Sequence, residues 1–218
     1  MMLLHDQLIA AMQREVVADR LIVTPLLDPD KQVGPGSIDL RLGTEFLEVL
    51  RRQETIVDPF AVDAADAEAA GEADQSDRTY VPLGDAFVLH PGQFVLGATL
   101  EYLRLPADIG GQVLSRSSWG RMGLLVATAV AVQPGFKGVL TLELVNNGNV
   151  PLLLRPGLRV AQLQLWTAGV STGSTYDSGG KYQAPLGPQS NRLAWEQPEK
   201  DRLQAIGDRL HARSRPHQ

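Results

Sequence analysis

The feature that most restricts the fold of this chain is a succession of short β-prone runs separated by turn residues. Pro-Gly, Asn-Gly and Gly-Gly signals punctuate these runs, which read GPGSIDLRLG, FVLHPGQFVLGATLEYLRL, IGGQVLS, TAVAVQPGF and GVLTLELVNNGNVPLLLRPGLRVAQLQLW. Such spacing is typical of antiparallel strands and leaves little room for the helices that connect parallel strands. The sequence therefore predicts an all-β fold, with NNGN as a hairpin turn and HPG and RPG as two further tight turns.

Helical periodicity is confined to the two ends of the chain. Apolar residues recur at helical spacing in two places, at Leu4, Leu8, Ile9 and Met12 and again at Leu203, Ile206 and Leu210. The first fifteen residues are therefore predicted to form a short amphipathic helix that caps a barrel or sandwich. The second set predicts an amphipathic segment that docks on the body of the protein or on a neighbour.

Two segments lack the pattern of a packed core. Residues 61–78, AVDAADAEAAGEADQSDR, are acidic and Ala-rich without an apolar face, which predicts a surface loop or a loose helix. After Trp166 the chain becomes rich in Gly, Ser, Pro and Gln, which predicts a flexible tail that orders on something else. A chain of 218 residues can bury one core, so we expect one β-domain over residues 1–170 and a tail over 171–218.

The composition excludes several classes of function. A net charge of −5 with scattered Lys and Arg gives no basic footprint for nucleic acid or an anionic membrane, although a few local arginines suffice for a small anion. The chain has no cysteine, which excludes disulfides and Cys-based zinc sites and fits a reducing cytoplasm. The four histidines are dispersed, and the zinc-dependent deaminase spacing is missing from the sequence. No apolar run has the length of a membrane span.

The densest cluster of polar groups is SRSSWGRMG, residues 115–123. Its two arginines can form bidentate hydrogen bonds with phosphate oxygens. The adjacent hydroxyls and the N–H groups at a helix start add neutral donors for the same anion. The structural alternative is a capped helix, with Ser117 or Ser118 as the N-cap and solvated arginines. The cluster alone leaves both interpretations open.

A second candidate is the single carboxylate in LTLELV, Glu143. Alternation along a strand places Leu140, Leu142 and Leu144 on one face and Glu143 on the other, among small apolar and hydroxyl neighbours. Glu143 is then either a solvated residue on the wet face of a strand or an acid/base group in an apolar pocket. Asp39, in GSIDLRLG, is expected to hold a turn or a neighbouring strand through hydrogen bonds.

Taken in order, these motifs resemble the dCTP deaminase family, the trimeric relatives of the all-β dUTPases. The resemblance covers most of the chain outside the acidic segment and the last twenty-odd residues, and it rests on six ordered blocks: Gly36–Gly43, Phe87–Gly111, Ser115–Leu125, Thr128–Gly148, Leu154–Leu163 and Gly180–Arg192. It implies a dUTPase-like distorted β-barrel and a cytoplasmic homotrimer with active sites between subunits. The substrate it implies is dCTP bound as its magnesium complex, which loses its 4-amino group to water without zinc.

The resemblance also assigns roles to residues of this chain. Glu143 matches the catalytic glutamate that moves protons between water, the ring nitrogen and the leaving ammonia. Ser117, Arg121 and the backbone of Ala129 match groups that orient the water. The residues matched to nucleotide binding are Arg116, Ser118, Gln133, Tyr176, Lys181, Tyr182 and Gln183. The last four lie in the tail, which is expected to close over the active site.

Departures from the family pattern keep three hypotheses open. Gln133 stands where the family has an aspartate; it can bond a sugar hydroxyl but cannot act as a base. Ala131 and the segment Ala184–Leu186 replace residues that are polar in other members. The leading hypothesis is a dCTP deaminase. The alternatives are a bifunctional dCTP deaminase/dUTPase or dUTP diphosphatase, and a catalytically silent module that binds dCTP, dUTP or dTTP.

Overall fold

Strands and turns make up most of the chain that the computed structural model describes, namely residues 1–48, 78–127, 131–169, 184–189 and 197–214. The chain divides into two compact units by its internal contacts. One contains Met1–Val49 and Arg78–Gln189, and the other contains Leu50–Asp77 and Ser190–Gln218. Apart from Arg78, the acidic segment 61–78 lies outside the described residues.

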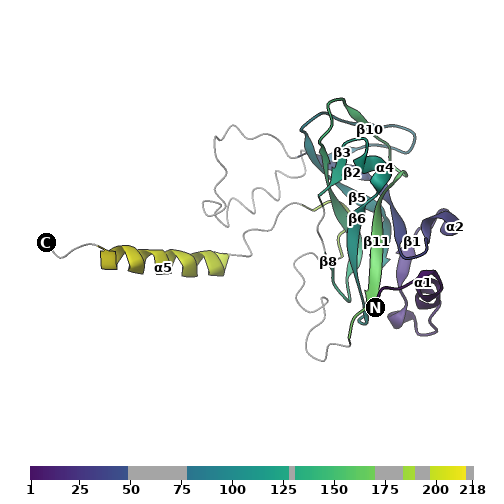
Figure 1. Cartoon of the computed structure of the whole chain (residues 1–218), viewed down its shortest axis with the longest axis horizontal. Helices are drawn as coiled ribbons and strands as arrows, with labels where there is room; N and C mark the ends of the chain where they lie inside the picture. The colour runs from purple at the N-terminus through teal and green to yellow at the C-terminus, as the bar shows by residue number, and fades with distance from the viewer. Residues whose placement is uncertain (49–77, 128–130, 170–183, 190–196, 215–218) are drawn as a thin grey trace. The chain divides into compact units, whose positions relative to one another are not determined.

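The first unit contains all the strands in the described part of the chain (Figure 1). They are β1 (Ile22–Thr24), β2 (Ile38–Glu48), β3 (Arg78–Tyr80), β4 (Phe87–Leu89), β5 (Phe94–Arg104), β6 (Ile109–Ser115), β7 (Leu124–Val126), β8 (Ala131–Val132), β9 (Lys137–Asn146), β10 (Leu152–Leu154) and β11 (Arg159–Thr167). The helices are α1 (His5–Met12), a 3₁₀ turn at Val17–Asp19, α2 (Pro29–Gln32), α4 (Ser117–Gly120) and, in the second unit, α5 (Gln197–Ser214).

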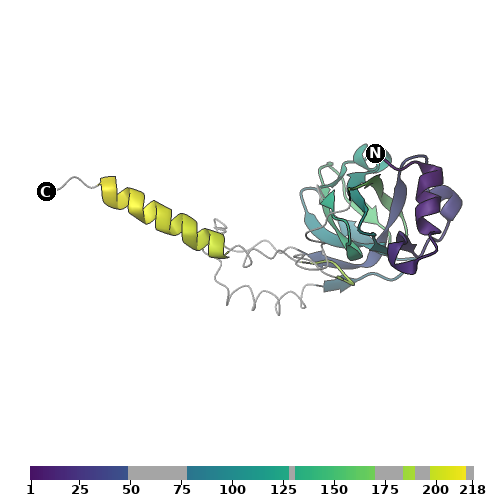
Figure 2. The ribbon, with the colours of Figure 1, turned by 90° about the horizontal axis from the view of Figure 1, so that it is seen from below.

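Nine of these strands form one antiparallel sheet that curls on itself. Its main order is β7-β9-β5-β2-β11-β6-β8, with β1 added to β5 and β3 added to β2. The two edge strands, β7 and β8, are joined by residues 127–130, so their facing ends are at most ~19 Å apart, five Cα steps. Bulges in β2 and β5 help the long strands to bend. The resulting half-barrel, seen along its strands in Figure 2, confirms the predicted dUTPase-like all-β architecture.

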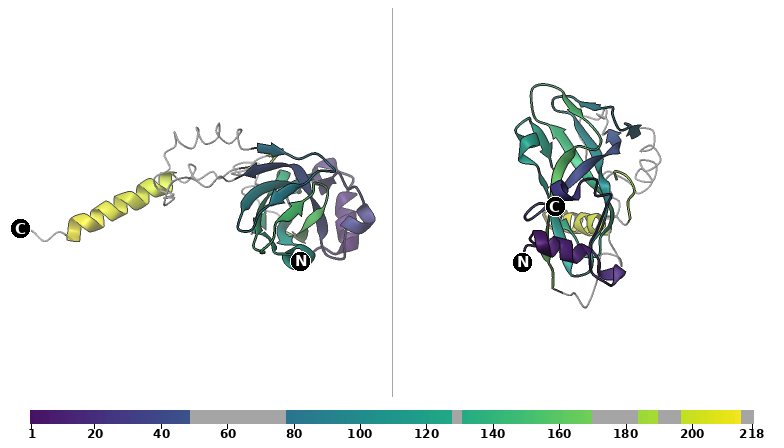
Figure 3. Two further views of the ribbon diagram at one scale, coloured as in Figure 1. Left: turned by 90° about the horizontal axis from the view of Figure 1, so that it is seen from above. Right: turned by 90° about the vertical axis from the view of Figure 1, so that its right-hand side faces the viewer.

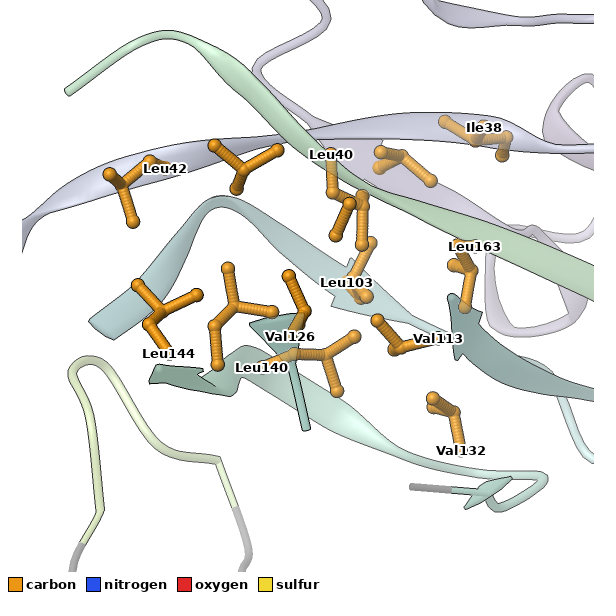
Figure 4. Packing of buried hydrophobic residues seen from close by; sticks show 14 of the residues in the cluster. Ile38, Leu40, Leu42, Leu103, Val113, Val126, Val132, Leu140, Leu144 and Leu163 are labelled. Carbon is orange, nitrogen blue, oxygen red and sulfur yellow. The ribbon is translucent and has the colours of Figure 1, made fainter. Parts of the chain in front are cut away.

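The inside of this half-barrel is filled with aliphatic side chains (Figure 4). Leu140, Leu142 and Leu144 of β9 are at most 5% exposed, as their alternation predicts. Facing strands contribute residues such as Leu42 of β2 and Val113 of β6. The alternation of leucines in LTLELV therefore sets which way Glu143 points, because burying three leucines inside turns Glu143 to the outer face.

The turn predictions are confirmed in two cases and wrong in one. His90 and Arg155 each accept a hydrogen bond from the residue three positions on, which confirms the HPG and RPG turns. NNGN is not a hairpin, because β9 pairs with β5 and β7 whereas β10 pairs with β4. The buried side chain of Asn146 explains the departure: its Nδ2 donates to the carbonyls of Leu89 (2.9 Å) and Val150 (2.8 Å), which directs the chain toward β4.

Both predicted helical segments are present. In α1, Leu8 is fully buried and packs in the core with Ile9 and Met12 beside it, while Leu4 precedes the helix and is exposed. Helix α5 (yellow in Figure 3) exposes about half of Leu203 and Ile206. Within the described ranges, no helix combines the length and apolarity needed to cross a membrane.

Candidate functional site

Glu143 lies half-buried near the middle of β9, on the outer face of the curled sheet. Its main-chain carbonyl accepts a hydrogen bond from the N–H of Ala127 (2.8 Å), the first residue after β7. On the other side of β9 it pairs with Leu96 of β5, which in turn pairs with Leu47 of β2. Three neighbouring strands therefore place two leucines and one carboxylate in a row on the same face.

That outer face is apolar beside the carboxylate. Four buried residues form an outer apolar cluster, separate from the interior core: Leu47 (2% exposed), Leu96 (8%), Ala98 (4%) and Val139 (8%). Thr141 shares this face of β9 with Glu143 and is also half-buried. Glu143 therefore lies on the outer face, as the solvated-strand interpretation expects, but it is only partly exposed and has buried apolar residues on the neighbouring strand. A partly covered carboxylate beside an apolar wall is an arrangement that acid/base chemistry uses.

The SRSSWGRMG cluster connects β6 to β7 and is held at its base by Ser115. The Ser115 hydroxyl donates to the carbonyl of Val126 and accepts from its N–H, both at 3.2 Å. At the far end, the Gly123 carbonyl accepts from Asn147, the residue after β9. The cluster is therefore fixed to the strand that carries Glu143 and to its immediate neighbour.

Within the cluster, α4 begins at Ser117 without a side-chain cap. Its N-cap is Arg116, so the alternative in which Ser117 or Ser118 caps the helix is wrong, and both serines are exposed. Arg121, at the C-terminal end of α4, is exposed as well. Arg116 is not a solvated arginine: its Nη1 donates to the carbonyl of Arg159 (3.1 Å), and its Nη2 lies 3.4 Å from Asp39 Oδ2.

Gln133 follows β8 and is exposed at the first position of a Pro-Gly turn. Its carbonyl accepts a hydrogen bond from Phe136 (3.1 Å), and Gly135 at the third position has φ +84°, a value that glycine adopts without strain. The turn needs only the backbone of residue 133, so its geometry does not depend on whether the side chain is glutamine or aspartate. Ala131, the first residue of β8 and two positions before Gln133, is exposed as well.

The short segment Ala184–Gln189 is docked on β9. The Ala184 N–H donates to the carbonyl of Lys137 (3.1 Å), and the Val139 N–H donates to the carbonyl of Pro185 (2.9 Å). Further along, the Gln189 N–H donates to Thr141 Oγ1 (3.1 Å). The sequence predicts that Ala184–Leu186 lacks side chains for phosphate contacts, which stays a prediction. The structure adds that the backbone here lies along the strand that carries Glu143.

A family comparison agrees with this arrangement. The model of the dCTP deaminase-like family matches residues 3–168, which contain every strand of the half-barrel that the structure describes. The chain belongs to the dCTP deaminase-like family. Its curated relatives include a dCTP deaminase from Natronomonas pharaonis, 41% identical over 88% of this chain and 95% of that protein. Another, from Halobacterium salinarum, is named dCTP deaminase, dUMP-forming, and is 41% identical over 88% of this chain and 95% of that protein.

Among solved structures, the 2'-deoxycytidine 5'-triphosphate deaminase from Agrobacterium tumefaciens superposes with a TM-score of 0.53 at 25% identity. The alignment covers 77% of this chain and 48% of that one, so this chain spans about half the length of the solved protein.

The dCTP deaminase-like family was thus predictable from the sequence, whereas several contacts in the site region were not. Ala129, Tyr176, Lys181, Tyr182 and Gln183 lie outside the described residues, so their assigned roles remain predictions. In the part of the chain that the structure describes, no group of three or more His, Cys, Asp or Glu side chains could hold a metal ion.

A buried carboxylate, Glu101 of β5, was overlooked in this dCTP deaminase-like chain. It is fully buried and accepts hydrogen bonds from Gln32 Nε2 (2.9 Å) and the backbone N–H of Arg41 (2.8 Å). Burial raises the pKa of Glu101, against the lowering effect of these hydrogen bonds. A signal was present, because alternation from Leu103 and Leu105 places Glu101 on the inward face.

Proposed function

We propose that this protein is a zinc-independent dCTP deaminase that converts dCTP and water to dUTP and ammonia. The observation that carries the proposal is Glu143, a half-buried carboxylate beside an outer apolar cluster in a member of the dCTP deaminase-like family. The relatives named dCTP deaminase support the same reaction. Magnesium enters with the triphosphate as part of the substrate.

In this mechanism Glu143 takes a proton from water, and the oxygen adds to C4 of the cytosine ring. Glu143 passes that proton to the ring nitrogen. It then takes the proton of the new C4 hydroxyl and delivers it to the amino group, so the C4–N bond breaks, ammonia leaves and C4 becomes a carbonyl. Ser117, Arg121 and the backbone of Ala129 orient the water. Such proton transfers contribute about 10²–10⁴-fold to the rate.

The remaining matched residues bind the nucleotide in this proposal. Arg116 and Ser118 contact the triphosphate, and Gln133 bonds the sugar hydroxyl. Residues 171–218 form a C-terminal tail that closes over the site with Tyr176, Lys181, Tyr182 and Gln183. The protein acts as a homotrimer, as the family resemblance implies, and its expected location is the cytoplasm.

The test is ammonia release from magnesium-bound dCTP by wild type and by Glu143→Gln. We expect the variant to lose about 10²-fold or more in kcat, because glutamine cannot carry the proton. A matched control is Glu48→Gln, in which the amide oxygen can still accept the Thr79 hydroxyl that now bonds Glu48 Oε1 (3.0 Å). Equal activity of Glu143→Gln and wild type would refute the role of Glu143, and a wild type that binds dCTP without turnover would favour the silent module.

A second candidate reaction adds hydrolysis of the triphosphate. It is favoured by relatives that are named dCTP deaminase, dUMP-forming, including those from Halobacterium salinarum and Dictyoglomus turgidum. Gln133 argues against it, because an amide cannot act as a base toward the attacking water. Measuring pyrophosphate beside ammonia separates the two: the bifunctional enzyme releases both from dCTP, and the deaminase releases ammonia alone.

A further inference from the structure

Two arginines from separate segments converge on one buried carboxylate at the junction of β6 and α4. Asp39 Oδ2 lies 3.0 Å from Arg159 Nη1 and 3.4 Å from Arg116 Nη2. The Asp39 side chain is 10% exposed, whereas the arginine side chains are 25% (Arg116) and 28% (Arg159) exposed. The other carboxylate oxygen accepts from Gln162 Nε2 (3.2 Å), so both oxygens of Asp39 are engaged.

The backbone of Arg159 also binds side chains of the segment that follows β6. Its carbonyl accepts from Arg116 Nη1 (3.1 Å) and from Trp119 Nε1 (2.9 Å). The Arg116 N–H also donates to the carbonyl of Val160 (3.3 Å). The first two carbonyls of β11 therefore bind both the backbone and the guanidinium of Arg116. Asp39, on the neighbouring strand β2, binds the side chain of Arg159.

The charges of this group do not cancel. Two guanidinium groups and one carboxylate leave a net charge of about +1 in a partly buried place, where charges are screened less than on the open surface. Nη1 of Arg116 donates one hydrogen bond and Nη2 forms the ion pair with Asp39, while a guanidinium carries five N–H donors. The donors that remain are held in one orientation, which suits bidentate contact with phosphate oxygens.

We propose that Asp39 is a positioning residue for the triphosphate: it acts through Arg116 and Arg159 and orients the guanidinium groups toward the phosphate oxygens of the nucleotide. This inference rests on the proposed function, since it takes Arg116 as a triphosphate ligand. It extends that function by giving Arg159 a part in the same anion site and Asp39 a role beyond linking two strands.

Neutralising Asp39 distinguishes a positioning role from a purely electrostatic one, because the two roles predict opposite changes in dCTP affinity. If Asp39 were only a negative charge near the anion, Asp39→Asn would strengthen the positive field and tighten dCTP binding. If Asp39 positions the arginines, the same change weakens dCTP binding by about tenfold, roughly the loss of one charge-assisted hydrogen bond. The weakening should be much smaller for dCMP, which offers fewer phosphate oxygens.

The experiment measures the Kd of magnesium-bound dCTP and of dCMP by calorimetry, together with KM and kcat for ammonia release. The variants are Asp39→Asn, Asp39→Glu and the control Asp108→Asn. Asp108 also carries a carboxylate–arginine pair, with Arg14 Nη2 2.8 Å from its Oδ2, but lies at the other end of β6, roughly 20 Å of strand away from Arg116.

We expect Asp39→Asn to raise the Kd and KM for dCTP with little change in kcat, Asp39→Glu to recover part of the loss, and Asp108→Asn to bind dCTP as wild type does. Tighter dCTP binding by Asp39→Asn, or equal weakening for dCTP and dCMP, would overturn the positioning role. A wild type that binds dCTP but releases no ammonia would refute the deaminase proposal, and the binding ratios would still decide the role of Asp39.

Discussion

Gly138→Ala should detach the segment Ala184–Gln189 from β9. Gly138 has φ +131°, and a Cβ at this position would lie 2.4 Å from Pro185 Cδ and 2.8 Å from its backbone nitrogen. Neither atom can move aside alone, because the ring and the backbone are fixed together. The alanine must therefore adopt an unfavourable backbone conformation and push the docked segment off the strand edge.

The expected destabilisation of Gly138→Ala follows from the backbone strain and the lost hydrogen bonds. Alanine in a left-handed conformation costs about 1–2 kcal/mol. Undocking also removes the hydrogen bonds of Val139 to Pro185 (2.9 Å) and of Ala184 to Lys137 (3.1 Å), each worth about 0.5–1.5 kcal/mol net. The loss in the free energy of unfolding should therefore be about 2–5 kcal/mol if the docked segment unfolds with the half-barrel.

Gly84 provides a matched control. It also has a left-handed conformation, φ +102°, but a Cβ there would meet no atom within 4 Å, so Gly84→Ala reports the backbone strain alone. Urea denaturation gives the two stabilities, and hydrogen exchange of the Val139 amide reports docking directly. We expect that amide to exchange at least about tenfold faster in Gly138→Ala than in Gly84→Ala. Equal exchange of the Val139 amide in the two variants would refute the docking of Pro185 on Gly138.

Two buried or paired carboxylates should give opposite pH dependence of stability. Because the pKa of Glu101 is raised on folding, its contribution to stability is complete below the ordinary glutamate pKa of about 4.3 and is lost as the pH rises through the folded value. Glu101→Gln leaves one buried donor, from Gln32 or Arg41, without its acceptor, at a cost of about 1–3 kcal/mol near neutral pH. The difference in stability between wild type and variant should widen in acid. A difference in urea midpoints that does not change with pH would contradict this. Asp108 behaves in the opposite sense: its hydrogen bond with Arg14 lowers its pKa, so its contribution is present at neutral pH and is lost as the pH falls through the folded value. Since this pair is about one-third exposed, Asp108→Asn should cost only about 0.2–1 kcal/mol at pH 7 and less in acid, as thermal denaturation at both pH values can check.

Local sequence rules worked where a feature depends on a few neighbouring residues. The turns at HPG and RPG follow from the backbone preferences of Pro and Gly, and the inward leucines of β9 follow from two-residue alternation. The role of Asp39 as a hydrogen-bonding link between strands was also predicted correctly, since it contacts Arg159 and Gln162 of β11.

The same rules failed where a residue's neighbours come from distant parts of the chain. NNGN has the composition of a hairpin turn, but the buried Asn146 side chain binds the end of β4 and sends the next strand there. Ser117 has the right type for an N-cap, but the contacts of Arg116 with β11 decide where α4 begins. The packing of Pro185 on Gly138 also joins residues far apart in the sequence, and no local rule predicts it.

The sequence alone determined that this chain forms short antiparallel strands, that Glu143 points away from the leucines of its own strand, and which family the ordered motifs resemble. Those properties are local or are carried by the order of residues along the chain. Tertiary structure alone decided that buried apolar residues lie beside Glu143 on the outer face, that Asp39 binds two arginines, and that Glu101 is buried among hydrogen-bond donors. These depend on strand register and on contacts between residues far apart in sequence, which residue types and local spacing do not encode.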